Sequence, residues 1–98
     1  MKNMIDAITK FRDERGWKGN HDLKDLAISI SLEANELLEN FQWKSDQEAL
    51  QSPDQNIKEE MADVFIYLLQ MADKMNVDLE EEVFKKMKKN AIKYPVTK

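Results

Sequence analysis

The stretch SLEANELLENFQW, residues 31–43, decides how this chain can fold. Its apolar residues recur every three or four positions, in line with Leu26 and Ile30 before it, which is the spacing of an amphipathic α-helix. Glu33 lies inside this stripe, between Ile30 and Leu37. Because an unpaired carboxylate at a core-facing position is costly, the stretch predicts a packed helix in which the burial of Glu33 must be compensated.

The same periodicity extends along the chain and predicts an all-α protein of one domain, residues 1–98. The expected helices lie at about 1–15, 22–41, 57–75 and 78–92. Asp22 and Asp78 are suitable N-caps for the second and fourth of them. Residues 44–56 are expected to form a loop with one short turn near SDQEAL. With only 2 Gly and 2 Pro, the chain has little capacity for a turn-rich β fold.

Two of the predicted helices are apolar on more than one side. At about 100° per residue, Ile28 and Leu32 point far round the second helix from Leu26 and Leu37. A chain of this size buries only roughly 60–65% of its unfolded surface, so the extra apolar face favours packing against another subunit. We therefore expect a four-helix-bundle fold assembled as a homodimer or homotetramer. The alternative is that some of these apolar positions stay exposed.

The composition excludes several classes of protein. A formal net charge of −4 argues against generic nucleic-acid binding, which needs a clustered basic surface. The absence of cysteine excludes disulfides, thiol catalysis and cysteine metal sites. No stretch approaches the roughly 20 apolar residues of a membrane span, and the N-terminus lacks an apolar signal segment. We expect a cytoplasmic protein that binds neither nucleic acid nor membrane.

Two pairs of acidic residues have the spacing that places side chains on one face of a helix. Glu33 and Glu36 belong to the second predicted helix, and Glu60 and Asp63 to the third. Charges gathered around one cavity at roughly 6 Å repel by about 3 kcal/mol per pair. A divalent cation relieves that repulsion, and oxygen ligands favour Mg²⁺ or Mn²⁺, with Ca²⁺ as a further option. The competing interpretation is a solvated helix face, where Glu-x-x-Glu is common.

These segments resemble a known family. SLEANELLENFQWK, followed by EEMADVFIYLLQMADKMNVDLEEEVFKKMKKNAIKYP, is similar to the MazG-like nucleoside triphosphate pyrophosphohydrolases, in particular the small single-domain dCTP pyrophosphatase type. The family's Glu-x-x-Glu and Glu-x-x-Asp motif falls on the two acidic pairs. The resemblance implies an all-α bundle with active sites near subunit contacts. It also implies Mg²⁺-dependent hydrolysis of a nucleoside triphosphate to the monophosphate and pyrophosphate.

The resemblance further implies roles for individual residues. Glu33, Glu36, Glu60 and Asp63 would be metal ligands, and Glu36 would also act on the attacking water. The residues that match phosphate- and sugar-binding positions are Lys86, Asn90, Lys93 and Tyr94. The first three recur on one face of the last helix. The alternative is a solvated lysine-rich helix end, which the helix dipole also favours.

Aromatic residues and one histidine match positions near the base pocket of that family. They are Trp17, His21, Trp43 and Tyr67. An aromatic ring can stack on a nucleobase. The alternatives are that the tryptophans cover the ends of a small core, that His21 is structural or exposed, and that Tyr67 only packs.

The function predicted from the sequence is hydrolysis of a deoxy- or modified pyrimidine nucleoside triphosphate, as a nucleotide-pool house-cleaning reaction. Within the superfamily, a dUTP or phosphoribosyl-ATP pyrophosphohydrolase is the nearest alternative. Outside it, the alternatives are a non-catalytic helical interaction module and a nucleotide sensor that turns over slowly. Pyrophosphate release with and without Mg²⁺ distinguishes an enzyme from either of them.

Overall fold

The computed structural model of this chain describes residues 1–17, 22–51 and 55–96. Within these ranges the regular structure is entirely helical, which confirms the all-α prediction. The helices are α1 (Lys2–Glu14), α2 (Leu23–Glu39), α3 (Asp46–Gln51), α4 (Gln55–Lys74) and α5 (Leu79–Lys93). None of the helices in these ranges is both long and apolar enough to cross a membrane.

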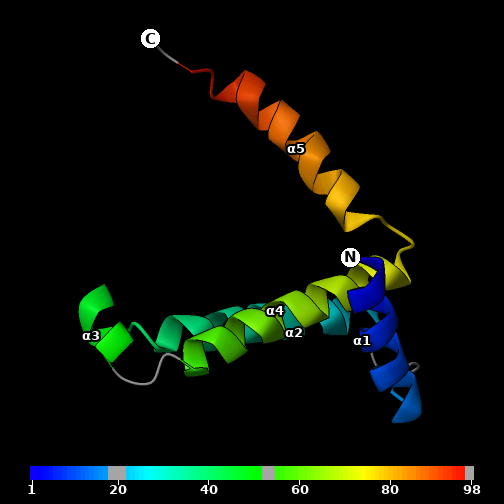
Figure 1. Cartoon of the computed structure of the whole chain (residues 1–98), viewed down its shortest axis with the longest axis horizontal. Helices are drawn as coiled ribbons and strands as arrows, with labels where there is room; N and C mark the ends of the chain where they lie inside the picture. Colours follow the sequence, from blue (N-terminus) through cyan, green and yellow to red (C-terminus); the bar gives the residue numbers. More distant parts are fainter. Residues whose placement is uncertain (18–21, 52–54, 97–98) are drawn as a thin grey trace.

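An antiparallel pair of helices, α2 and α4, forms the body of the molecule (Figure 1). Leu26 of α2 and Leu69 of α4 are each 1% exposed and form the centre of the core. Helix α1 packs against α4 at one end of the pair (Figure 1). The core is narrow, because the buried apolar side chains among the described residues are only Leu26 of α2, Ala49 of α3, and Leu69 and Ala72 of α4.

Helices α2 and α5 begin at the predicted aspartate caps. The Asp22 carboxylate accepts from the backbone N–H of Asp25 at 2.7 Å, and Asp25 Oδ2 accepts from the backbone N–H of Asp22 at 3.4 Å. This reciprocal capping box satisfies two otherwise unpaired donors. Asp78 caps α5 by accepting from the backbone N–H of Glu81 at 3.1 Å. Both start positions were predictable because capping depends on neighbouring residues alone.

Helix α1 ends in a turn that places Trp17. Gly16 has a φ of +67°, a left-handed conformation that glycine adopts without steric cost. The N–H of Trp17 donates to the carbonyl of Arg12 at 3.1 Å, and the N–H of Gly16 to that of Asp13 at 3.1 Å, as in a Schellman motif. The Trp17 ring then meets Phe11 edge-on, with ring centroids 6.0 Å apart.

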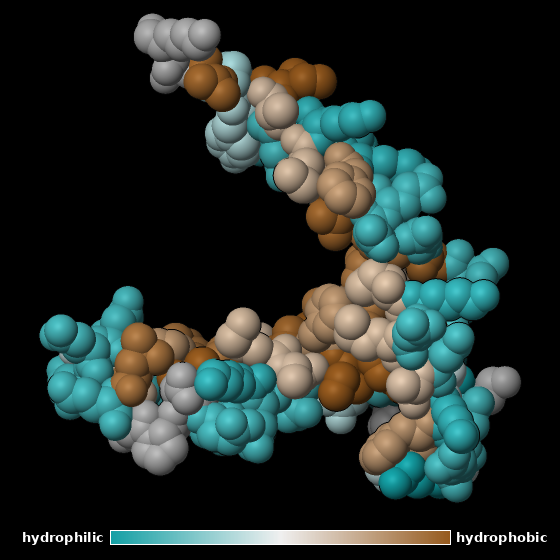
Figure 2. All heavy atoms as spheres, in the orientation of Figure 1, coloured by the Kyte–Doolittle hydropathy of each residue, from teal (hydrophilic) through white to brown (hydrophobic). Residues whose placement is uncertain are grey.

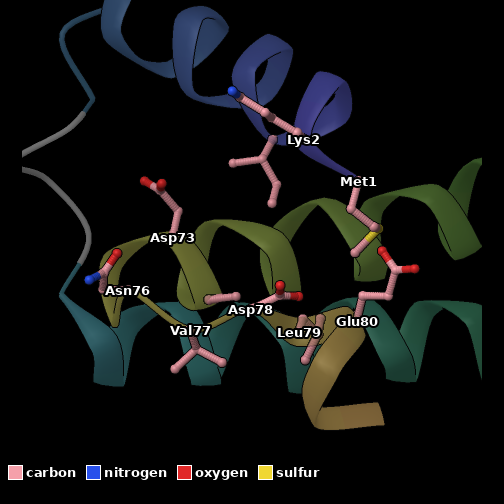
Figure 3. Close-up of a pocket in the computed structure, with 10 residues that line it drawn as sticks. Met1, Lys2, Asp73, Asn76, Val77, Asp78, Leu79 and Glu80 are labelled. Atoms are coloured by element: carbon pink, nitrogen blue, oxygen red, sulfur yellow. The ribbon is translucent and has the colours of Figure 1, made fainter. Parts of the chain in front are cut away.

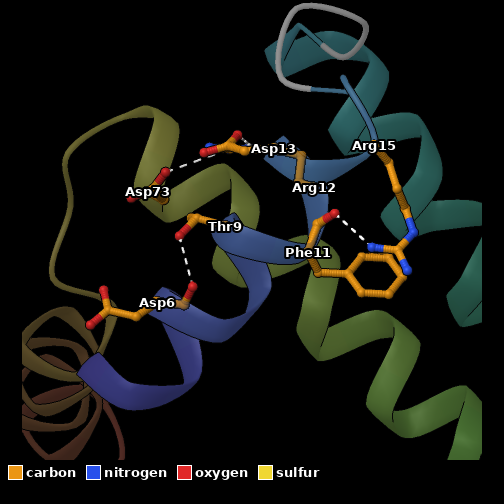
Figure 4. A network of polar contacts seen from close by, with 7 residues as sticks. All are labelled: Asp6, Thr9, Phe11, Arg12, Asp13, Arg15 and Asp73. Carbon is orange, nitrogen blue, oxygen red and sulfur yellow. Dashed lines mark hydrogen bonds and ion pairs between the residues drawn. The ribbon is translucent and has the colours of Figure 1, made fainter.

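The side chain of Arg12 connects α1 to α4 (Figure 4). Arg12 is only 9% exposed, which is unusual for arginine. Its guanidinium contacts Asp13 at 3.1 Å and Asp73 of α4 at 3.5 Å. Because a buried charge without a partner is expensive, these carboxylates are what allow the arginine to be buried. The contact fixes the end of α1 on the body.

Helix α3 occupies part of the segment that we expected to be a loop with one short turn. Ser45 and Glu48 cap it reciprocally, each backbone N–H donating to the other side chain at 3.2 Å. Ala49 is 5% exposed and anchors the helix. Ser-x-x-Glu is a capping-box sequence, so this helix start was readable from the sequence.

Helix α5 extends away from the rest of the chain (Figure 1). It has no buried residue, and Val83, Phe84 and Met87 are 49–59% exposed. Figure 2 shows hydrophobic residues at the surface of this helix and along the body below it. A single chain therefore does not complete the expected four-helix bundle, because the fourth long helix does not pack on the other three.

Candidate metal centre

The predicted carboxylates meet at the contact between α2 and α4. Glu33, Glu36 and Glu60 each offer one carboxylate oxygen, and these oxygens all lie within 4.8 Å of one another. Glu33 and Glu36 are one turn apart on α2, and Glu60 faces them from α4. The antiparallel packing thus joins residues far apart in the sequence into one acidic cluster.

Two oxygens of this cluster are buried without compensation. Glu33 Oε2 and Glu60 Oε2 have no hydrogen-bond partner within the part of the chain that the structure describes. A buried acceptor that lacks a donor is costly, and a buried carboxylate is more so. Oxygen-only ligands at this spacing fit a hard divalent cation such as Mg²⁺ or Mn²⁺. The residues present therefore fit the predicted metal.

The pKa values of the cluster reflect this crowding. Burial, together with the nearby Glu60, Glu36 and Asp63 carboxyls, raises the pKa of Glu33 to about 7. Burial also raises the pKa of Glu60, helped by the charges of Glu36 and Asp63 and opposed by Glu33. Without a cation, Glu33 is therefore partly protonated near neutral pH.

Asp63 lies beside the cluster. It is not among the three residues whose oxygens converge, although its charge raises the pKa of Glu33. Asp63 instead lines an adjacent pocket. The structure thus unites three of the four predicted ligands and leaves the fourth at the boundary between cluster and pocket.

The adjacent pocket has a volume of about 580 Å³ and is lined mainly by α1 and α4. Trp17, Phe11 and Tyr67 contribute aromatic walls, and Asp63 contributes a carboxylate. Burial raises the pKa of Tyr67, as do the charges of Glu33, Asp63 and Glu36. Trp17 and Tyr67 therefore share one pocket next to the acidic cluster, as a base site would require.

The other two residues predicted to contact the base are Trp43 and His21. Trp43 is 98% exposed, has a φ of +63° and does not line this pocket. His21 lies outside the described residues. The exposure of Trp43 shows that it does not cover the core of its own chain, which was the structural alternative for this residue.

The predicted phosphate and sugar contacts lie on α5 and its C-cap, away from the acidic cluster (Figure 1). Lys86, Asn90 and Lys93 belong to the helix, and Tyr94 is its C-cap. The Lys93 ammonium lies 5.4 Å from the centroid of the Tyr94 ring. Within one chain, these residues and the carboxylates do not form one site.

A separate pocket of about 590 Å³ lies where α5 leaves the body (Figure 3). Lys2, Asp73, Asp78 and Glu80 are among its polar residues. Asp73 already pairs with Arg12, and Asp78 caps α5. Asp73 and Asp78 thus have structural partners, unlike the buried oxygens of the acidic cluster.

The sequence model of the MazG-like family matches residues 28–98. This chain belongs to the MazG-like family. The match includes both acidic pairs and all of α5. The resemblance of the sequence to this family is therefore confirmed.

Individual relatives of this MazG-like chain carry related names. It is 40% identical over 92 residues to dCTP pyrophosphatase 1 of Rattus norvegicus and 38% identical over 91 residues to that of Homo sapiens. These alignments cover 89% and 88% of this chain but 54% of each relative, so the chain spans about half their length. A pyrophosphatase crystal structure from Archaeoglobus fulgidus superimposes with a TM-score of 0.91 at 45% identity, covering 98% of this chain and 93% of that one.

Sequence reasoning missed three polar residues of this MazG-like chain. Arg12 lines the pocket beside Asp63 and is held by Asp73. Asn40, the C-cap of α2, accepts a hydrogen bond from Asn56 of α4. Asn40 follows Glu36 by four residues and Asn56 precedes Glu60 by four, but this spacing indicates a pair only once α2 and α4 are known to be antiparallel neighbours.

Proposed function

We propose that this chain hydrolyses a nucleoside triphosphate to the monophosphate and pyrophosphate with the help of Mg²⁺, for which Mn²⁺ can substitute. The observation that carries the proposal is a pair of buried oxygens, Glu33 Oε2 and Glu60 Oε2, that have no hydrogen-bond partner among the described residues. Carboxylates in such positions are stable when a cation neutralises them. The names of the relatives, dCTP pyrophosphatase 1 and pyrophosphatase, support the same chemistry.

The acidic cluster would hold the metal through Glu33, Glu36 and Glu60, and Asp63 would add a ligand from the edge of the pocket. When bound, Mg²⁺ supplies positive charge that neutralises the triphosphate oxygens as charge develops on them. The carboxylates differ in exposure: Glu36 is exposed, whereas Glu33 and Glu60 are half-buried. The exposed carboxylate is therefore the one that water reaches most readily.

Glu36 would accept a proton from the attacking water. The water oxygen forms a bond to the α-phosphorus, and the bond from that phosphorus to the bridging oxygen of the β-phosphate breaks. Pyrophosphate leaves with the electron pair, and the monophosphate keeps the water oxygen. A positioned carboxylate contributes about 10²–10⁴-fold to such a step.

The substrate we propose is a deoxy- or modified pyrimidine triphosphate, removed from the nucleotide pool. The pocket beside Asp63 has aromatic walls, and Trp17 and Tyr67 lie next to the carboxylates. Its volume of about 580 Å³ lies within the range of small-molecule sites. The dCTP pyrophosphatase relatives favour a pyrimidine base.

The test is pyrophosphate release from a panel of canonical and modified triphosphates, with and without Mg²⁺. We expect metal-dependent release, and a loss of about 100-fold or more for Glu36→Gln. Glu39→Gln, on the same helix but outside the cluster, is the matched control and should retain activity. Absence of pyrophosphate with every triphosphate contradicts the proposal and favours a sensor or an interaction module.

The active assembly we propose is a homodimer or homotetramer in which α5 of one chain packs on another. Three apolar side chains of α5, namely Val83, Phe84 and Met87, are exposed in the single chain, as are Ile28 and Leu32 of α2. An isolated helix of this length is marginal in water, so α5 needs a surface on which to pack. A second copy offers the matching apolar face.

Such packing would bring the basic face of α5 to the acidic cluster of another chain. Lys86, Asn90, Lys93 and Tyr94 would then contact phosphates and sugar there. Mixing inactive Glu36→Gln with inactive Lys86→Ala tests this, because half of randomly mixed dimers would regain one intact site. We expect about a quarter of wild-type activity to return. No recovery in mixtures that have exchanged subunits shows that each site uses one chain.

A further inference from the structure

A side-chain hydrogen bond joins α2 and α4 beside the acidic cluster. Asn56 Nδ2 donates to Asn40 Oδ1 at 2.7 Å. Asn40 lies four residues after Glu36 on α2, and Asn56 lies four residues before Glu60 on α4. Because a turn contains 3.6 residues and rises about 5.4 Å, the amide pair forms the next layer along the antiparallel helices.

Asn40 is held in place by its own helix. Its Nδ2 donates to the carbonyl of Glu36 at 3.2 Å and to that of Leu37 at 3.3 Å. These bonds hold the amide against the last turn of α2, where the Leu37 carbonyl also accepts from the backbone N–H of Asn40 at 3.3 Å. They also fix the amide plane, so that Oδ1 presents its lone pairs to Asn56. The pair therefore connects the end of α2 to the first turn of α4.

The hydrogen bond between Asn56 and Asn40 favours one axial register of α2 against α4. The core residues Leu26 and Leu69 are apolar, and hydrophobic attraction has no preferred direction. The bond from Asn56 to Asn40, by contrast, is directional: although exposed to solvent, its 2.7 Å geometry is met at one axial alignment of the two helices. A slip of one residue moves a side chain by about 1.5 Å along the axis and 100° around it. Such a slip would separate Glu60 from Glu33 and Glu36.

We propose that Asn40 and Asn56 are positioning residues that keep α2 and α4 in the register at which Glu33, Glu36 and Glu60 converge. The two amides act on the metal ligands indirectly, by holding α2 and α4 in place. This inference rests on the proposed function, because it assigns metal binding to the carboxylates. It adds a second polar layer to the site, built from residues that the acidic motif does not contain.

The test is the affinity of the full chain for Mn²⁺, measured by electron paramagnetic resonance. Asn56→Leu removes the interhelical donor but leaves the bonds of Asn40 to its own helix intact. We expect its affinity to fall about tenfold, as is usual for residues that orient metal ligands. Asn56→Ala should give the same loss, and Asn56→Gln, which keeps an amide donor, should recover most of the affinity.

Gln55→Leu is the matched control. Gln55 is the neighbouring residue of α4, and its amide donates at 3.5 Å to Glu59 of the same helix. This variant should bind Mn²⁺ like wild type, with circular dichroism confirming equal helicity in all variants. Wild-type affinity in both Asn56→Leu and Asn56→Ala overturns the inference alone. A wild-type chain that binds no Mn²⁺ overturns the proposed function, and this inference with it.

Discussion

The substitution of Glu33 by glutamine tests the electrostatic account of the acidic cluster. The pKa of Glu33 is raised from 4.5 to about 7 by burial and by the neighbouring carboxyls. The folded chain therefore binds more protons than the unfolded chain between these pH values. The contribution of Glu33 to the stability of the folded chain is therefore fully present below about pH 4.5, and it is lost as the pH rises through about 7. Glutamine is neutral at every pH and does not incur this loss.

The expected gain follows from the size of the shift. A change of 2.5 pKa units corresponds to about 3 kcal/mol at 1.36 kcal/mol per unit. Glu33 is half-buried, and access of water reduces this to about 2 kcal/mol. For a domain of this size, we expect Glu33→Gln to melt about 10 °C higher at pH 8 in EDTA. At pH 4.5 the two proteins should melt within a few degrees.

Thermal unfolding followed by circular dichroism, with and without Mg²⁺, measures this difference. Added Mg²⁺ should raise the melting temperature of wild type more than that of Glu33→Gln, because the variant has lost one ligand and part of the repulsion that the metal relieves. Glu39→Gln is the control for loss of an exposed charge on α2. Equal melting temperatures of wild type and Glu33→Gln at pH 8 in EDTA would refute the electrostatic reasoning.

Other predictions test the turn after α1, the core and the protonation of the site. Gly16→Ala should lower the free energy of unfolding by about 1 kcal/mol, measured by urea unfolding, because Gly16 has a φ of +67°. No atom of the described residues beyond its chain neighbours lies within 4 Å of an added Cβ, so the cost comes from the backbone conformation and not from a clash. An unchanged urea midpoint contradicts this prediction. Leu26→Ala should cost about 2–5 kcal/mol in the same assay, because Leu26 is 1% exposed, and a loss below about 1 kcal/mol would mean that the core repacks. Mg²⁺ binding at pH 7 should release about half a proton per chain from Glu33, whose pKa is about 7, and less at pH 8.5; a pH-indicator dye measures the release, and equal release at both pH values argues against a raised pKa.

Local patterns predicted the helices and the acidic pairs. The caps at Asp22 and Asp78 and the stripe through Leu26 depend on residues within one or two turns, so spacing alone identifies them. The convergence of Glu33 and Glu36 follows from the helical repeat. Their meeting with Glu60 was a hypothesis that required α2 and α4 to be neighbours, and the structure shows that they are.

Contacts between distant segments were not predictable in the same way. Arg12 reads as one more charged residue of an amphipathic helix, and only the packing of α1 on α4 buries it against Asp73. The amide pair of Asn40 and Asn56 requires the axial register of two helices, which no local spacing specifies. Asp63 has the right spacing to Glu60 but lies at the edge of the cluster, because helix rotation decides which side it faces.

By itself, the sequence determined that this chain is helical, where its long helices begin, and which carboxylates share a helix face, because each depends on interactions within a few residues. The tertiary structure decided which faces meet. Within the part of the chain that the structure describes, it brought Glu33 and Glu36 to Glu60, enclosed two of their oxygens without hydrogen-bond donors, and left the apolar face of α5 without a packing partner. The physical reason is that burial and the pKa shifts it causes depend on how helices pack, and packing is a property of the whole chain.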